Sequence, residues 1–128
     1  MFLGLRTTIY PAPDLAAATA WFTDVLGKPP YFDEPFYVGF EVGGYELGLA
    51  PDAPVEDGAV TYWGVPDAAA AHARLLTAGA TEHSAVAEVG GGIKVGAVVV
   101  AGGALLGVIE NPHFALSPVT DAGDGPGC

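Results

Sequence analysis

The chain has few of the residues that form disulfides, bind soft metal ions or attract polyanions. Its 128 residues contain one cysteine, Cys128, and four basic side chains against fifteen acidic ones, for a formal net charge of −11. A single cysteine excludes an internal disulfide and a cysteine-based metal site, and favours a cytoplasmic location. The acidic balance repels a phosphate backbone, so we expect no nucleic-acid partner.

Long apolar segments are also missing. The longest, residues 95–109, is interrupted by glycines and is shorter than the roughly 18 residues that a membrane-spanning helix needs. Arg6 breaks the apolar start of the chain, so no secretory signal is visible. We therefore expect no membrane partner. Because 51% of the residues are apolar, we expect a folded chain.

What the chain does contain is a near-repetition. Residues 13–22 (PDLAAATAWF) return about 53 residues later as residues 66–75 (PDAAAAHARL). Each copy follows a β-like run, at residues 5–10 or 60–65, and precedes β-rich sequence with a Gly-Gly pair. The order predicts a strand, a helix and several strands, twice.

These boundaries predict one domain, residues 1–116, built from two units. The units cover about residues 4–50 and 59–114, joined by a linker at 51–58 that is rich in proline and acidic residues. Residues 117–128, rich in glycine, proline and aspartate, are expected to form a disordered tail.

Local signals place the helices and hairpins within each unit. Asp14 and Asp67 are N-cap residues for two amphipathic helices that end near Gly27 and Gly79. The Gly43-Gly44 pair predicts a tight turn between residues 37–42 and 45–49, and a second hairpin joins residues 93–100 to 105–110.

The register of the first hairpin matters for function. If Gly43-Gly44 forms a two-residue turn, Glu41 lies opposite Glu46, and the two carboxylates repel unless a proton, a cation or water intervenes. Alternatively, Glu41 lies at the rim in solvent, or the turn is longer and the pair does not form.

The repeated unit, with Asp opening the helix and Trp21-Phe22-Thr23-Asp24-Val25-Leu26-Gly27 closing it, resembles the vicinal-oxygen-chelate superfamily. That superfamily includes glyoxalase I, bleomycin-resistance proteins and extradiol dioxygenases. The resemblance implies an α+β fold of two βαβββ repeats whose curled mixed sheets form a cup, with the helices on the outer faces. It also implies a homodimer, in which Thr7 and Glu46 face Val60, Tyr62 and Gly107 of the partner chain. Assembly of the cup within a single chain is the alternative.

Metal enzymes of this superfamily hold a divalent ion with side chains from the first and last strands of each unit. The matching positions are Thr7 and Val60, each seven residues before a capping Asp, together with Glu46 and Gly107. Only Glu46 could bind a metal strongly, so the resemblance predicts no metal and no cofactor. The histidines, His72, His83 and His113, are expected to be surface or capping residues.

By the same resemblance, the cup is lined by alternate residues of the strands: Thr7, Ile9, Glu41, Glu46, Gly48, Val60, Tyr62, Gly107 and Ile109. This describes an apolar pocket with a carboxylate, a tyrosine hydroxyl and bare glycine backbone. The predicted function is to bind a small, mainly apolar or aromatic molecule in the cup. A positive charge on that molecule is one option, and drug sequestration is one role. The alternative is a lyase, isomerase or dioxygenase with Glu46 as general base or with an unusual metal site.

Overall fold

The computed structural model describes residues 1–114. The expected tail at residues 117–128 lies outside the described residues, and so does Cys128. The elements, in chain order, are β1 (Gly4–Pro11), α1 (Leu15–Leu26), β2 (Phe32–Glu34), β3 (Tyr37–Val42), β4 (Tyr45–Ala50), the short 3-10 helix η1 (Val55–Asp57), β5 (Val60–Gly64), α2 (Ala68–Thr77), β6 (Thr81–Glu88), β7 (Lys94–Val99) and β8 (Leu105–Glu110).

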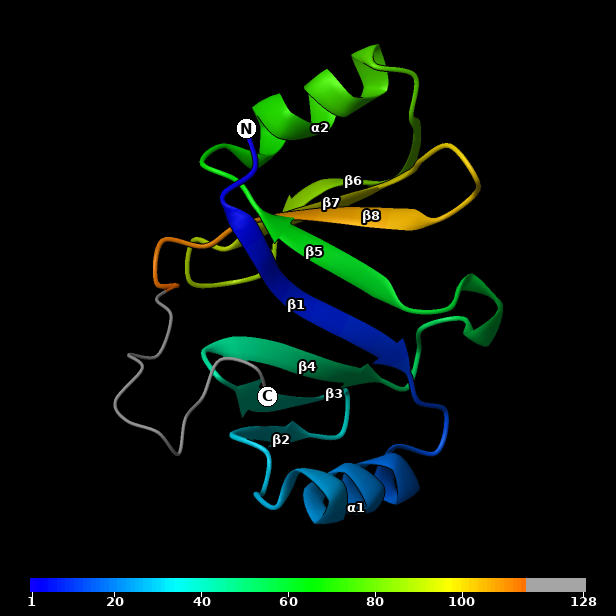
Figure 1. The fold of residues 1–128 in the computed structure, drawn as a ribbon, viewed down its shortest axis with the longest axis vertical. Coiled ribbons are helices and arrows are strands. Elements are labelled where there is room, and N and C mark those ends of the chain that lie inside the picture. Colours follow the sequence, from blue (N-terminus) through cyan, green and yellow to red (C-terminus); the bar gives the residue numbers. More distant parts are fainter. Residues whose placement is uncertain (115–128) are drawn as a thin grey trace.

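The eight strands form one mixed sheet in the order β2-β3-β4-β1-β5-β8-β7-β6. β1 and β5 pair antiparallel at its centre, β1 pairs parallel with β4, and β5 pairs parallel with β8. Figure 1 shows the two central strands between the half-sheets, with the helices at opposite ends of the molecule. The two halves of the chain therefore join through the strands that open them.

Helix α1 forms where its capping residues predict it. The Asp14 carboxylate accepts a hydrogen bond from the Ala17 amide at 3.1 Å, and Gly27 ends the helix in the left-handed conformation, with φ 75°. The apolar side of the helix packs on a cluster that contains the buried Phe40 and Leu49. This packing anchors the helix to one face of β3 and β4.

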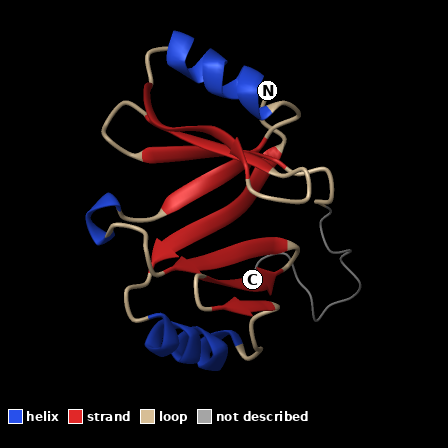
Figure 2. Ribbon diagram, turned by 180° about the vertical axis from the view of Figure 1, so that it is seen from behind, coloured by secondary structure: helices blue, strands red, loops and turns tan. Residues whose placement is uncertain are grey.

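Helix α2 covers the second half-sheet in the same way. Asp67 accepts a hydrogen bond from the Ala70 amide at 3.0 Å, and Ala68 and Ala71 pack with Val65 and Val108. The small alanine side chains let the helix approach the sheet closely. Figure 2, seen from behind, shows both helices on the outside of the sheet, as predicted.

The first hairpin has the predicted two-residue turn. Gly43 and Gly44 both have positive φ, 62° and 91°, which a tight primed turn requires. Val42 pairs with Tyr45, and Glu41 lies opposite Glu46. The predicted register of this hairpin is confirmed.

Two strands have no clear signal in the sequence. β2 has three residues, all exposed, and β6 has one partly buried residue among eight. Both lie at the edges of the sheet, so neither shows the apolar alternation that reveals a half-buried strand. Among residues 1–114, no helix is long and apolar enough to cross a membrane.

Candidate functional site

Four predicted site residues lie side by side across the centre of the sheet. The strand registers place Glu46 of β4 beside Thr7 of β1, Thr7 beside Tyr62 of β5, and Tyr62 beside Gly107 of β8. We call these four residues the central row. Their neighbours in the strands, such as Leu47 and Val108, pack under the helices, so the row lies on the opposite, concave face.

The other predicted residues flank this row. Ile9 lies beside Gly48 on one side and Val60 on the other. Ile109 lies two residues beyond Gly107 in β8, and Glu41 lies across from Glu46. The structure thus brings the whole predicted set to one face of one sheet.

The register corrects one matched position. The residue beside Gly107 is Tyr62, whereas Val60 lies opposite Ile9. Counting seven residues back from the capping Asp works for Thr7 but not in the second half of the chain, because β1 continues four residues beyond Thr7 whereas β5 ends two residues beyond Tyr62. The position equivalent to Thr7 is therefore occupied by Tyr62.

The structure also differs from the expectation of a cup shared between chains. Thr7 lies opposite Tyr62 of the same chain, because β1 and β5 pair within the sheet. The concave face is consequently assembled from the two halves of a single chain. A dimer is not needed to bring the central row together.

Glu46 has hydrogen-bonding partners on the concave face. The hydroxyl of the buried Thr7 donates to one carboxylate oxygen at 3.3 Å, and the Tyr31 hydroxyl donates to the other at 2.8 Å. Glu46 itself is only partly buried. The carboxylate is therefore held by neutral donors and remains accessible to a ligand.

Three tyrosines near this row are held neutral. Burial, followed by the hydrogen bond to Glu46, raises the pKa of Tyr31 far above its ordinary value. Burial, followed by the negative charge of Glu46, does the same to the pKa of Tyr37, and burial raises the pKa of Tyr62. The phenols therefore keep their protons throughout the physiological pH range.

The glycines of the concave face make room for these side chains. A Cβ at Gly39 would lie 2.5 Å from a Glu46 carboxylate oxygen, and one at Gly107 would lie 2.3 Å from the Tyr62 ring. At Gly48 a Cβ would lie even closer to the Tyr37 hydroxyl. The expectation of bare backbone at Gly48 and Gly107 is therefore wrong, because the chain's own tyrosines lie over both.

Glu41 has partners of its own. Its carboxylate lies 2.9 Å from the Lys28 ammonium, and it also accepts a hydrogen bond from the Gly44 amide. The predicted pair of facing carboxylates does form, but the positive charge of Lys28 offsets the repulsion. The pair needs no shared proton or bound cation.

The sequence analysis missed two tyrosines and an arginine. Tyr37 could have been found, since it lies four residues before Glu41 in the same strand and thus shares its face. Tyr31 precedes strand β2, which has no signal of its own in the sequence, and no sequence pattern places Tyr31 beside Glu46. Arg6 reaches the concave face because of a bulge in β1 between Leu5 and Thr7, which cannot be seen in the sequence.

The histidines do not gather into a site. His83 lies 3.4 Å from Asp57, and a His113 ring nitrogen lies 2.9 Å from the Gly91 carbonyl. His72 corrects the expectation of a surface or capping residue: it is 6% exposed and pairs with Glu82 at 3.0 Å. Within residues 1–114, no group of three or more His, Cys, Asp or Glu side chains could hold a metal ion.

The central row does not fit a divalent metal either. It offers one carboxylate, two hydroxyl-bearing side chains and a glycine, whereas transition-metal sites use three or four imidazole, thiolate or carboxylate ligands. The carboxylate oxygens also already accept hydrogen bonds from Thr7 and Tyr31. The side chains of the central row therefore lack the ligand set of a transition-metal site.

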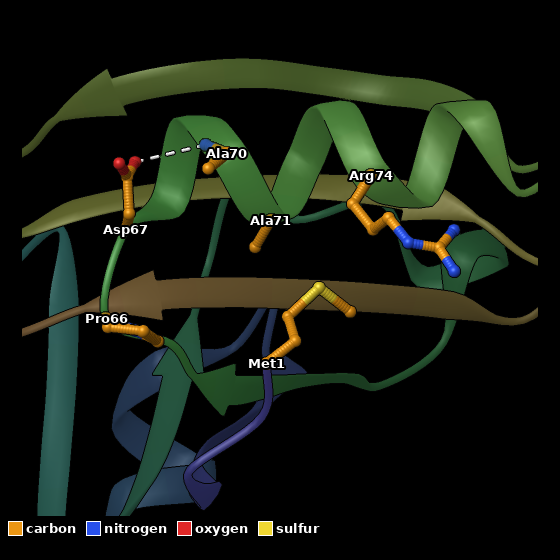
Figure 3. A pocket seen from close by; sticks show the side chains of 6 residues that line it. All are labelled: Met1, Pro66, Asp67, Ala70, Ala71 and Arg74. Atoms are coloured by element: carbon orange, nitrogen blue, oxygen red, sulfur yellow. Dashed lines mark hydrogen bonds between the residues drawn. The ribbon is translucent and has the colours of Figure 1, made fainter.

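Two hollows lie away from the concave face. One, of about 240 Å³, is open to solvent at the start of α2 and is shown in Figure 3. Met1 and Arg74 line it, together with Asp67, whose carboxylate accepts a hydrogen bond from the Ala70 amide. The other, of about 690 Å³, lies between α1 and β2 and is lined in part by Asp33 and Glu34. Neither contains a residue of the central row.

No family model and no curated protein matches the sequence. Solved structures, in contrast, match most of it. A variant of methylmalonyl-CoA epimerase from Streptomyces coelicolor, in complex with 2-nitronate-propionyl-CoA, aligns with a TM-score of 0.73 at 14% identity, covering 88% of this chain and 99% of that one. A glyoxalase/bleomycin resistance protein/dioxygenase superfamily member from Vibrio splendidus aligns with a TM-score of 0.67 at 21% identity, covering 83% and 97%.

The chain has the vicinal-oxygen-chelate fold. A hypothetical protein from Bacillus halodurans C-125 is also similar, with a TM-score of 0.70 at 14% identity, over 88% of this chain and 97% of that one. The predicted α+β class and the resemblance to this superfamily are confirmed. At these identities the similarity shows the fold alone, so function has to be argued from the site.

Proposed function

We propose that this chain binds a small, mainly apolar or aromatic molecule that presents a positively charged or hydrogen-bond-donating group to Glu46. The observation that carries the proposal is the Glu46 carboxylate, fixed on the concave face by Thr7 and Tyr31 and still partly exposed. A preorganised carboxylate of this kind binds an ammonium group without having to be ordered first.

The surroundings of Glu46 favour a cationic group. The Tyr31 hydroxyl lies 2.8 Å from Glu46, and burial and the Glu46 charge both act on Tyr37. The ring of Phe32, which pairs opposite Gly39, lies 6.2 Å from the Tyr37 ring. Aromatic rings beside a carboxylate attract a cation through their π-faces, and the net charge of −11 adds to the attraction.

The binding is proposed to be metal-free, because three of the four positions in the central row lack a carboxylate, imidazole or thiolate. Composition supports the remaining parts of the proposal. The acidic charge disfavours nucleic acid, and the single cysteine suits the cytoplasm. A homodimer and a single domain of two units, at about 4–50 and 59–114, stay predictions. Drug sequestration is one role that this kind of binding would serve.

A second candidate is acid–base catalysis, as a lyase or isomerase, with Glu46 as general base. The observation in its favour is the neutral phenol of Tyr62, two strands away in the central row, which could donate a hydrogen bond to a developing oxyanion. Against it, both carboxylate oxygens of Glu46 already accept hydrogen bonds. Exchange of a carbon-bound proton for solvent deuterium, lost in Glu46→Gln, would favour the enzyme.

The binding proposal is tested with benzylamine, an aromatic ring with one ammonium group. We expect benzylamine to shift the amide resonances of β1, β4 and β5 in an NMR titration, and Glu46→Gln to weaken its binding about tenfold or more. Glu88→Gln, which removes the same charge from the exposed edge strand β6, is the matched control and should change the affinity less than twofold. Equal affinities for the wild type and Glu46→Gln would show that Glu46 does not contact the ligand.

A further inference from the structure

Arg6 is a basic side chain whose position on the concave face follows from the sheet register. β1 and β5 shift register between Leu5 and Thr7, so that Arg6 is the extra residue of a β-bulge. Its guanidinium lies over Gly64, where a Cβ would approach the Arg6 side chain to 2.5 Å. Val65, the next residue, packs under α2, so Gly64 and the guanidinium over it face the concave side.

The guanidinium is held in place but is not neutralised by any residue of the described range, 1–114. Its Cζ lies 3.7 Å from the centre of the Phe114 ring, and Nη1 donates to the Leu5 carbonyl at 2.9 Å. Among residues 1–114, Arg6 makes no ion pair, and neither Nε nor Nη2 finds a protein acceptor. Stacking against an aromatic ring fixes the plane of the group and leaves its N–H edge for a ligand.

We propose that Arg6 is a carboxylate-binding subsite, and that the ligand of the concave face is bipolar, with a carboxylate at Arg6 and an ammonium group at Glu46. This inference rests on the function proposed above. A planar guanidinium with free N–H groups is suited to bidentate recognition of a carboxylate.

The two subsites are suitably spaced for one small molecule. Glu46, Thr7 and Tyr62 lie on three neighbouring strands, and Gly64 is two residues beyond Tyr62. From the usual strand separation and rise per residue, the backbone at Gly64 lies on the order of 10 Å from that at Glu46. A molecule with charged groups at opposite ends of one aromatic ring matches this span.

The net charge explains why a bipolar ligand is favoured over a simple anion. The net charge of −11 repels an approaching anion, and this repulsion opposes the local attraction of a carboxylate to Arg6. A bipolar molecule has no net charge, and its ammonium group gains from the same field. Arg6 therefore adds affinity to a ligand that Glu46 already binds.

The test compares three probes that share one ring: 4-(aminomethyl)benzoate, benzylamine and benzoate, each titrated into the full chain by NMR. We expect 4-(aminomethyl)benzoate to bind about tenfold tighter than benzylamine, and benzoate to bind more weakly than either. Arg6→Gln should reduce the tenfold preference to less than about twofold and should not weaken the binding of benzylamine, which has no carboxylate and is repelled by the guanidinium. Arg74→Gln on the exposed side of α2 makes the same charge change and should preserve the preference.

Each other outcome is decisive. An unchanged preference in Arg6→Gln, with a lowered melting temperature, would mean that Arg6 only tethers Phe114, and would overturn the subsite. If the preference for 4-(aminomethyl)benzoate depends on Arg6 but does not change in Glu46→Gln, the result would support the subsite and refute the proposed function. Binding of none of the probes would overturn both. If Arg6→Gln does not fold, Arg6→Lys, which keeps the charge but lacks the planar fork, should fold and lose most of the preference.

Discussion

Replacing Gly107 with alanine tests whether the Tyr62 ring truly lies flat on the concave face. An added Cβ would come within 2.3 Å of Cδ1 and 2.6 Å of Cε1 of Tyr62. Ordinary contact between carbon atoms is about 3.5–4 Å, so the ring has to move by more than 1 Å or swing away from the sheet. The backbone of Gly107 has no positive φ, so the substitution perturbs packing and not the backbone conformation.

The expected cost follows from these two contributions. Overpacking a packed site costs about 1–3 kcal/mol, whereas replacing glycine by alanine at a compatible backbone position stabilises the fold by about 0.4–1 kcal/mol. We therefore expect Gly107→Ala to lower the free energy of unfolding by about 1–2 kcal/mol. At roughly 4 °C per kcal/mol for a chain of this length, the melting temperature should fall by about 4–8 °C.

A double-mutant cycle isolates the contact. In a Tyr62→Ala background the added methyl group meets no ring, so Gly107→Ala should be neutral or slightly stabilising in urea unfolding. In the single variant, displacement of Tyr62 should bring its phenol pKa back toward the ordinary value, because burial is what raises it. An equal cost of Gly107→Ala in both backgrounds would refute the proposed packing of Tyr62 over Gly107.

The remaining predictions concern the tyrosines and the oligomeric state. Tyr31, Tyr37 and Tyr62 have raised pKa values in the folded chain, so the unfolded chain loses these protons at a lower pH than the folded chain does. Their contribution to the free energy of unfolding should therefore be fully present below about pH 10 and be lost as the pH rises further. The double variant Tyr31→Phe/Tyr37→Phe should therefore show a flatter dependence of melting temperature on pH above 10, and parallel curves for the two proteins would contradict the assignment. Light scattering at micromolar concentration should give the mass of a dimer, since large apolar side chains such as Trp21, 59% exposed, remain uncovered on the single chain; a monomeric mass would end that prediction.

Local sequence was sufficient wherever the physical cause was local. The caps at Asp14 and Asp67 act within one turn, and the Gly43-Gly44 turn fixes the pairing of Glu41 with Glu46 because a two-residue loop permits one register. Alternation along each strand then assigned the residues of the concave face. The α+β class and the location of the candidate site were predictable for this reason.

Other features depend on pairing between distant strands, which no local pattern encodes. The register of β1 against β5 makes Tyr62, not Val60, the partner of Gly107 in the central row, and it builds the concave face within one chain. The edge strands β2 and β6 lack a buried face, so their sequences carry no period, and only their neighbours define them as strands.

The chemistry of the site was settled by tertiary structure as well. The sequence by itself determined that Glu46, with Glu41 opposite it, lies among apolar residues and glycines on one face of a sheet. Only the folded chain brings Tyr31 to the Glu46 carboxylate, lays Tyr62 over Gly107 and turns Arg6 onto the same face through a bulge. These are contacts between side chains from different strands, and their geometry exists only once the sheet has formed.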